Sequence, residues 1–297
     1  MAAQFPDDRI IAVGDERGLG VAADAEVAFS GNNPRHVRQL LDATPHLRWY
    51  HTVSAGVENM PLAELAERGI VLTNNSGSYD VQIAEHLMAF VFAASRKLHL
   101  YRDSQRTREW RDQDHVELRD ATMVIYGMGS IGGEAARLAK CVGMRVIGVR
   151  RRPAPQAGVT VLGADRLAEV AHEADYLAIT APLTPETRGA ISKEIIARLK
   201  PTAWVMNIAR GAIIDEPALI DALREGRIAG AALDVFATEP LPPDSPLWSL
   251  ENVILTPHTS GNSPKAGERS LALFAENLRR YKAGEPLLNQ VDYAVGY

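Results

Sequence analysis

The sequence has a single cysteine, Cys141, so no disulfide can form within the chain. No segment approaches the roughly 20 consecutive apolar residues that a membrane-spanning helix needs. The first residues also lack a basic region followed by an apolar run, so we expect no signal peptide. These absences together favour a cytoplasmic protein. Cys141 falls within a helical segment, where we expect it to be a buried, unreactive residue.

The chain also has little net charge, −5 at pH 7. A mildly acidic balance argues against nucleic acid or an anionic membrane as a partner. No spacing of histidine, cysteine or aspartate is typical of a ligand set, so we expect no metal. Internal repeats and low-complexity tracts are absent as well. The 297 residues, 46% of them hydrophobic, predict an ordinary globular protein of about two domains.

Apolar segments of strand length alternate with segments of helical period. Strands of this kind, joined by helices, imply parallel sheets covered on both faces and wound by right-handed crossovers. The predicted fold class is therefore α/β, with two doubly wound parallel sheets. The predicted strands are 9–13, 26–30, 47–53, 70–74, 122–127, 144–149, 176–180, 204–209, 230–235 and 253–257. The predicted helices are 34–45, 61–69, 81–105, 133–143, 164–174, 193–199, 216–227 and 264–284.

The last predicted helix is long enough to return to the first sheet, which implies a discontinuous first domain. We expect a substrate domain built from residues 1–93 and 265–297, with a dinucleotide-binding domain, 94–264, inserted in it. Only about ten residues separate the first two predicted strands, whereas a crossover with its helix needs at least 10–12. We therefore expect the first crossover helix to be vestigial or lost.

A glycine-rich turn follows the predicted strand 122–127 and opens the helix after it. Its glycines, Gly127, Gly129 and Gly132, have the spacing Gly-x-Gly-x-x-Gly. Between a strand and a helix this spacing is typical of dinucleotide binding, because the glycines permit a tight turn, leave room for the pyrophosphate and let helix and strand pack closely. The N–H groups and the dipole of the helix start attract phosphate. A glycine-rich turn without a ligand is the alternative.

Three arginines, Arg150, Arg151 and Arg152, follow the next predicted strand. An acidic residue at this place would accept hydrogen bonds from the ribose hydroxyls of NAD, but the chain has no carboxylate there. Guanidinium groups bind phosphate through paired hydrogen bonds. The cluster therefore predicts that NADP(H) is preferred, with NAD(H) possible. A solvated basic turn is the alternative.

Polar residues also follow later strands: Arg210, Asp234, Glu239 and His258. The carboxyl ends of parallel strands are where such sheets bind ligands. Hydride transfer to a ketone leaves a developing alkoxide, which needs a proton and a nearby positive charge. Histidine can give and take a proton near neutral pH, and arginine keeps its charge. A histidine and an arginine at such a place would suit the reduction of a carbonyl group.

Several long motifs resemble the D-isomer-specific 2-hydroxyacid dehydrogenases over nearly the whole chain. They are "SAGVEN", "GSYDVQIAEHLMAF", "GMGSIG", "NIARGAIIDEPALIDALREGRIAGAALDVFATEPL" and "LTPHTSG". The arginine-bearing turn is similar to that of NADP-preferring glyoxylate/hydroxypyruvate reductases. The resemblance implies a Rossmann cofactor domain inserted in a flavodoxin-like substrate domain, and a homodimer.

The resemblance also implies a role for each matching residue. Arg210 would bind the substrate's carboxylate and carbonyl, His258 would be the acid and base, and Glu239 would hold and polarise its imidazole. Main-chain groups near the first sheet would bind the substrate together with Arg210 and His258; these residues are Ser54, Ala55, Gly56 and Val57. The expected cofactor contacts are Gly127, Met128, Gly129, Ser130, Ile131, Gly132, Arg150, Arg151, Arg152, Ala181, Pro182, Thr187, Ile208, Ala209, Asp234 and Gly261.

The implied activity is hydride transfer between NADP(H) and a small 2-oxo acid such as glyoxylate or hydroxypyruvate. Two alternatives stay open: a dinucleotide-sensing, corepressor-like binding protein on the same fold, and a phosphoglycerate dehydrogenase. We expect the remaining histidines to be structural, with His86 a packing residue of the long helix. His51 lies close to the "SAGVEN" segment, so it could also line the pocket.

Overall fold

The computed structural model describes residues 4–13 and 16–296. They fall into two compact units, Met1–Tyr79 with Ser263–Tyr297 (the first unit) and Asp80–Asn262 (the second unit). The expected boundary after residue 93 lies inside helix α3 (Asp80–Ser95), which belongs to the second unit. Among the described residues, no helix is both long and apolar enough to cross a membrane.

The second unit is built on a seven-stranded parallel sheet with the strand order β10–β9–β8–β7–β4–β5–β6. The order reverses at β4, where Tyr126 pairs with Val149 on one side and Ile179 on the other. Four of the strands are buried at every residue, as expected for a sheet covered on both faces: β4, β7, β8 and β9. The strands are β4 (Thr122–Tyr126), β5 (Arg145–Arg150), β6 (Thr160–Gly163), β7 (Tyr176–Ile179), β8 (Trp204–Asn207), β9 (Gly230–Leu233) and β10 (Val253–Leu255).

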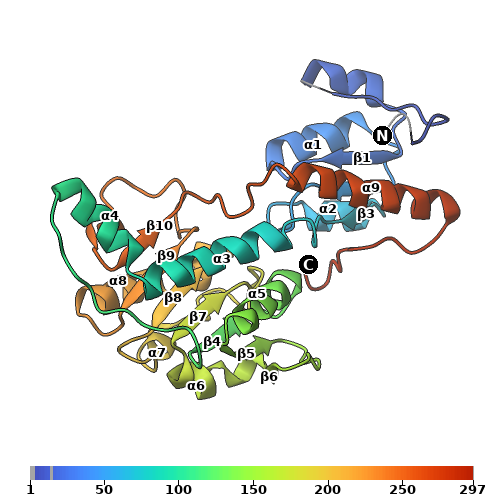
Figure 1. Cartoon of the computed structure of the whole chain (residues 1–297). Coiled ribbons are helices and arrows are strands. Elements are labelled where there is room, and N and C mark those ends of the chain that lie inside the picture. Colours follow the sequence, from blue (N-terminus) through green and yellow to red (C-terminus); the bar gives the residue numbers. More distant parts are fainter. Residues whose placement is uncertain (1–3, 14–15, 297) are drawn as a thin grey trace. The chain divides into compact units, whose positions relative to one another are not determined.

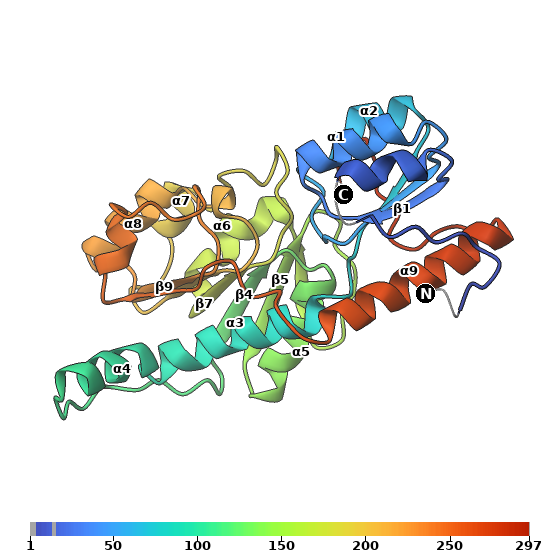
Figure 2. The same ribbon diagram turned by 90° about the horizontal axis from the view of Figure 1, so that it is seen from above.

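Helices cover both faces of this sheet, with α3 and α5 on one face and α6, α7 and α8 on the other (Figure 2). The helix starts carry local signals: the side chain of Asp215 accepts a hydrogen bond from Ala218 N at the start of α8. The doubly wound parallel architecture predicted from the sequence is confirmed. Besides α3, the helices are α4 (Leu98–Thr107), α5 (Ser130–Cys141), α6 (Leu167–Val170), α7 (Lys193–Ile196) and α8 (Glu216–Arg224), with short 3-10 turns η2 (Ala164–Arg166), η3 (Ala171–Glu173), η4 (Gly211–Ile213) and η5 (Pro246–Ser249).

The first unit has a three-stranded parallel sheet with the order β1–β2–β3. Helices α1 and α2 lie on one face and α9 on the other (Figures 1 and 2). The chain end returns beside β3, where Val291 N donates to Leu72 O. Both ends of the chain thus build this unit. Its elements are η1 (Glu16–Ala22), β1 (Val27–Ser30), α1 (Pro34–Ala43), β2 (Trp49–Thr52), α2 (Leu62–Glu67), β3 (Val71–Thr73) and α9 (Ala266–Ala283).

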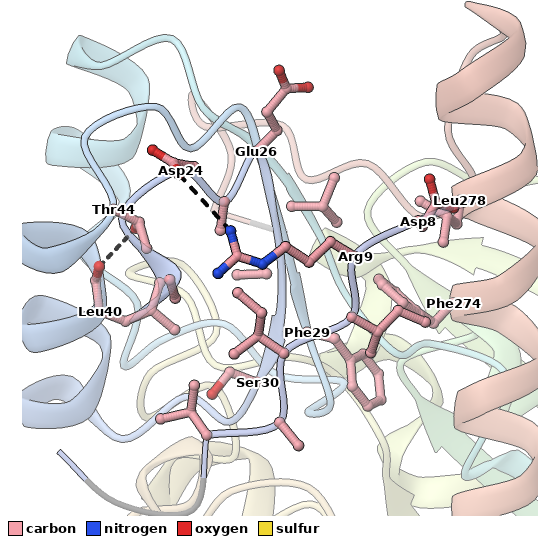
Figure 3. A pocket seen from close by; sticks show the side chains of 18 of the residues that line it. Asp8, Arg9, Asp24, Glu26, Phe29, Ser30, Leu40, Thr44, Phe274 and Leu278 are labelled. Carbon is pink, nitrogen blue, oxygen red and sulfur yellow. Dashed lines mark hydrogen bonds and ion pairs between the residues drawn. The ribbon is translucent and has the colours of Figure 1, made fainter. Parts of the chain in front are cut away.

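The predicted strand at 9–13 is wrong, because this segment forms no strand and β1 is an edge of the sheet. Beside that edge is a pocket of about 1020 Å³ (Figure 3). Its walls come from the 9–13 segment, from β1 and α1, and from α9 through Phe274 and Leu278. An ion pair between Arg9 and Asp24, 3.9 Å apart, lies at the pocket. The short 3-10 helix η1 stands where a full crossover helix would be, although residues 14 and 15 lie outside the described part.

Three smaller expectations also differ from the structure. Strand β6 was not predicted, since its four residues are only partly buried or exposed and lack a clear apolar pattern. The predicted long helix 81–105 is two helices, because Lys97 takes a left-handed φ of 54° between α3 and α4. Cys141 is exposed, because it is the last residue of α5 and not an inner position of its apolar face.

Candidate active site

The site residues expected in the second unit gather at one edge of its sheet. Each follows the carboxyl end of a strand, and parallel strands all end at the same edge. The segments after β4 and β5 carry the glycine turn and the arginines. The segments after the other strands are 180–187 (β7), 208–211 (β8), 234–239 (β9) and 256–261 (β10).

The glycine turn between β4 and α5 is packed so closely that two of its residues have no space for a side chain. Gly127 has a φ of +112°, and a Cβ there would lie 2.2 Å from Ala181 N. A Cβ on Gly132 would lie 2.2 Å from Gly127 O. Thr180 Oγ1 closes the turn by donating to Gly127 O over 2.5 Å. The first and third glycines are therefore required by the fold of the turn itself.

Gly129, by contrast, faces open space, with nothing within 4 Å of a Cβ built on it. Helix α5 begins at the next residue, Ser130, so the N–H groups of its first turn point toward this space. The side chain of Met128 turns the other way and is buried against Gly148 of β5. A tight turn, an open second glycine and a helix start together fit the pyrophosphate of a dinucleotide.

The arginine cluster begins at the last residue of β5, Arg150, which is partly buried. Arg151 and Arg152 follow it and are exposed. The cluster lies near the segment after β7, which contains Glu186. The pKa of the Glu186 carboxyl is held below its usual value, mainly because the Thr184 hydroxyl donates to it over 2.8 Å. The charge of the Arg151 guanidinium lowers this pKa more weakly. The arginines and the 180–187 segment thus border the same region.

The 180–187 segment is closed by threonine hydrogen bonds. Thr187 Oγ1 donates to Pro182 O over 2.7 Å and accepts from Thr184 N over 2.8 Å. Ala181 is buried against Gly127, whereas Pro182 is exposed. In the structure the Thr187 side chain therefore holds the shape of this turn.

Arg210 stands in a loop whose shape is set by a residue that the sequence did not single out. Asn207, fully buried at the end of β8, donates from Nδ2 to Arg210 O over 2.9 Å and accepts from Ala209 N over 3.0 Å. Ile208 and Ala209 are buried between them. Gly211 permits close approach, since a Cβ on it would lie 1.9 Å from Phe236 C. A polar residue at a buried strand end, next to the arginine, was the available signal.

His258 and Glu239 form the central pair of the site. His258 Nδ1 lies 2.7 Å from Glu239 Oε2, and the other oxygen of Glu239 accepts from Phe236 N over 3.0 Å. Because a carboxylate accepts, the imidazole donates through Nδ1–H, which leaves Nε2 to exchange a proton. The two side chains are 47% and 34% exposed, so both can meet a ligand. His258 has a φ of +52°, which is unusual for a residue other than glycine.

Asp234 holds the turn that carries His258 and is fully buried. Its carboxylate accepts from Thr256 Oγ1 over 2.5 Å, from Thr259 N over 2.8 Å and from Ser260 N over 3.0 Å. Its main-chain oxygen accepts from His258 N over 2.8 Å. Burial, the largest single influence, acts to raise the pKa of the Asp234 carboxyl, but these hydrogen bonds together lower it. Asp234 is thus an ionised anchor beneath the turn.

The loop expected to bind the substrate carboxylate, 54–57, follows β2 in the first unit. It is anchored from within that unit: Asn75 Nδ2 and Tyr79 Oη both donate to Val53 O, and Asn75 N donates to Ser54 O. Val57 is buried, whereas Ser54, Ala55 and Gly56 are partly exposed. Their main chain is therefore held in place while remaining reachable.

His51 lies in β2 and is fully buried. Its Nδ1 lies 2.7 Å from Thr73 Oγ1, and burial lowers its pKa to about 4. Its ring packs among Phe29, Trp49 and Phe274. These contacts make His51 a neutral residue of the first unit's core. In the described part of the chain, no group of three or more His, Cys, Asp or Glu side chains is arranged to hold a metal ion.

Comparisons with known proteins bear on this geometry. The model of the family described as "D-isomer specific 2-hydroxyacid dehydrogenase, NAD binding domain" matches residues 88–260. A glyoxylate reductase from Korarchaeum cryptofilum is 37% identical over 267 residues, covering 86% of this chain and 80% of that protein. A D-3-phosphoglycerate dehydrogenase from Methanocaldococcus jannaschii is 34% identical over 275 residues, covering 91% of this chain but only 52% of that protein.

A solved structure also matches the whole chain. It is a D-isomer specific 2-hydroxyacid dehydrogenase from Xanthobacter autotrophicus Py2 in complex with NADPH and MES. The two superpose with a TM-score of 0.84 and 31% sequence identity, over 100% of this chain and 93% of that one.

Proposed function

Because the chain belongs to the D-isomer specific 2-hydroxyacid dehydrogenase family and is therefore an oxidoreductase, we propose that it reduces a small 2-oxo acid, such as glyoxylate or hydroxypyruvate, with NADPH preferred over NADH. The observation that carries the proposal is the hydrogen-bonded pair of His258 and Glu239 at the same sheet edge as Arg210 and the glycine turn. The glyoxylate reductase of K. cryptofilum supports the choice of substrate class.

The residues of the chain divide the work of the reduction. The nicotinamide, when bound, supplies the hydride. Protonated His258 gives the proton on Nε2 to the oxygen that becomes the hydroxyl. Glu239 accepts from Nδ1–H and so stabilises the imidazolium before the proton is transferred. The guanidinium of Arg210 binds the carboxylate and the carbonyl oxygen of the acid. Loss of one such preorganised charged group costs a rate factor on the order of 10²–10³.

The preference for NADPH rests on the arginine cluster. Arg150 ends β5. Arg151 lies beside the 180–187 segment, where its charge helps to lower the pKa of Glu186. A 2′-phosphate on the ribose would meet positive charge there and no aspartate or glutamate at the strand end. The relative from X. autotrophicus, which matches the whole chain, is in complex with NADPH.

The test is a set of steady-state rates with a panel of 2-oxo acids, each with NADPH and with NADH. We expect turnover of glyoxylate or hydroxypyruvate and a kcat/KM at least about tenfold higher with NADPH. A clear preference for NADH would contradict the arginine assignment. Absence of turnover with every 2-oxo acid would contradict the proposed reaction.

The second candidate reaction is the oxidation of 3-phosphoglycerate, favoured by the 34% identity with the M. jannaschii enzyme. The chain spans about half the length of that relative. The same panel, extended to 3-phosphoglycerate with NAD⁺ and NADP⁺, separates the two candidates, because only a phosphoglycerate dehydrogenase would turn over this acid faster than glycolate or glycerate.

The proposal includes a cytoplasmic homodimer, with the seam along α3 and α4. One face of α3 is buried within the unit, where it packs against α5. Large apolar side chains remain exposed on and after these helices: Phe92, Leu98, Trp110 and Val116. We expect light scattering to give a dimer mass, and Trp110→Ser to weaken it. Trp248→Ser, at another exposed tryptophan, is the matched control.

A further inference from the structure

Helix α3 contacts the turn that carries His258 through two polar side chains. Gln82 Nε2 donates to Gly261 O over 3.1 Å. His86 Nε2 lies 3.0 Å from Thr256 Oγ1 and 3.9 Å from Asp234 Oδ1. The two residues are one helical turn apart and so lie on the same face of α3. The histidine that we expected to be a packing residue thus reaches the polar network beneath the site.

The chemistry of this network sets the direction of each hydrogen bond. The Asp234 carboxylate can only accept, so Thr256 Oγ1 gives its single proton to Asp234 Oδ1 over 2.5 Å. The hydroxyl then has only lone pairs left for His86, so His86 donates through Nε2–H. Burial lowers the pKa of His86, although the charge of Asp234 acts to raise it, so a neutral imidazole with the proton on Nε2 fits this place.

From this geometry we propose that His86 is a positioning residue for His258, acting through Thr256 and Asp234. The proposal rests on the proposed function, in which His258 Nε2 exchanges a proton with the substrate. His86 orients the Thr256 hydroxyl toward Asp234, and this hydroxyl completes the set of donors around the carboxylate. The carboxylate in turn holds the main-chain N–H groups that follow His258, Thr259 N and Ser260 N.

The conformation of the turn explains why the anchor matters. His258 has a φ of +52°, a left-handed conformation that is unfavourable for any residue with a Cβ and persists only where the surroundings enforce it. Several of the contacts that hold this turn converge on Asp234, whose main-chain oxygen also accepts from His258 N over 2.8 Å. A weaker hold on the Asp234 carboxylate lets the turn relax, and the imidazole then leaves its position for proton transfer.

The test compares His86→Leu, which removes the donor, with His86→Gln, whose amide N–H replaces it. We expect His86→Leu to lower kcat for the reduction of a 2-oxo acid by about tenfold, with the Kd of NADPH changed less than about twofold. His86→Gln should restore kcat to within about threefold of the wild type. His99→Leu is the matched control, since His99 is a partly buried histidine of the same unit that packs against Trp204.

A double-mutant cycle tests the route through Thr256. If His86 acts through this hydroxyl, the variant His86→Leu/Thr256→Val should be no slower than Thr256→Val alone. If instead the kcat losses of His86→Leu and Thr256→Val multiplied in the double variant, the route through Thr256 would be overturned. Equal impairment of His86→Gln and His86→Leu, or a kcat of His86→Leu within twofold of the wild type, would overturn the positioning role.

A measurement without turnover keeps this proposal separate from the proposed function. Hydrogen exchange at the amides of Thr259 and Ser260 reports the hold of Asp234 on the turn. We expect exchange at least about fivefold faster in His86→Leu, and near the wild-type rate in His86→Gln. Unchanged exchange in both variants overturns the positioning role even if the wild type turns over every 2-oxo acid. Faster exchange in His86→Leu, with no turnover by the wild type, would sink the proposed reaction and leave the anchor standing.

Discussion

Replacing Asp234 by asparagine preserves the shape of a fully buried side chain and removes its charge. Both carboxylate oxygens accept in the wild type, Oδ1 from Thr256 Oγ1 and Thr259 N, and Oδ2 from Ser260 N. An amide has one accepting oxygen and one donating nitrogen. Whichever way the asparagine is turned, its NH₂ group faces at least one N–H that also donates. The less damaging orientation places the NH₂ against Ser260 N.

The cost of that orientation follows from the bonds that it breaks. A hydrogen bond to a charged group contributes about 1.5–3 kcal/mol, and a buried donor left without an acceptor costs about 1–3 kcal/mol. The sum for Asp234→Asn is about 2.5–6 kcal/mol in the free energy of unfolding. For a unit of this size, each kcal/mol lowers Tm by about 2–4 °C, so the loss corresponds to roughly 5–24 °C.

The effect has a definite pH dependence. The pKa of Asp234 is lowered in the folded state from the ordinary value of 3.8. A lowered pKa contributes stability that is present above the unfolded value and is lost as the pH falls through the folded value. The gap in Tm between the wild type and Asp234→Asn should therefore be widest near pH 7 and should narrow below about pH 4.

Calorimetry or circular dichroism melts at pH 7 and at several lower values measure this gap directly. Steady-state kinetics at pH 7 add a second readout, since the turn that carries His258 should relax in the variant and kcat should fall. A Tm within about 2 °C of the wild type at pH 7 would refute the reasoning. So would a gap that widens on acidification, because it would mean that Asp234 is protonated in the folded protein.

Other changes should separate binding, chemistry and folding. His258→Gln should lower kcat by roughly 10²–10⁴ while NADPH titration by fluorescence shows an unchanged Kd; loss of both would indicate a structural role. The double variant Arg150→Ala/Arg151→Ala should raise the Kd of NADPH roughly tenfold to hundredfold and change the Kd of NADH less than twofold. Equal losses of affinity for the two cofactors would contradict a 2′-phosphate site. Ala28→Val, in the wall of the 1020 Å³ pocket, should raise stability by about 1 kcal/mol in urea melts, unless a ligand already fills that space.

The architecture of the second unit was readable from the sequence because it depends on local patterns. Short continuous apolar segments such as 122–126 are typical of buried strands in a parallel sheet, and the glycine spacing after this one leaves few conformations for the turn. The prediction of a strand at 9–13 was wrong because strand formation there depends on residues far away in the sequence. Residues 9–13 have the composition of a strand, but a strand needs a paired neighbour, and pairing with β1 depends on how the rest of the unit packs.

For the site, too, part of the arrangement follows from the sequence and part only from the tertiary structure. Amino-acid type and position after a strand determined that Arg210, Glu239 and His258 belong to one sheet edge, since parallel strands end together. Tertiary structure alone decided that Asp234 is fully buried, that Asn207 shapes the arginine loop, and that His86 reaches the network beneath His258. Residue type sets what a group can donate or accept, but a hydrogen bond forms only when donor and acceptor lie within a narrow range of distances. Only the folded chain brings residues far apart in sequence to such distances.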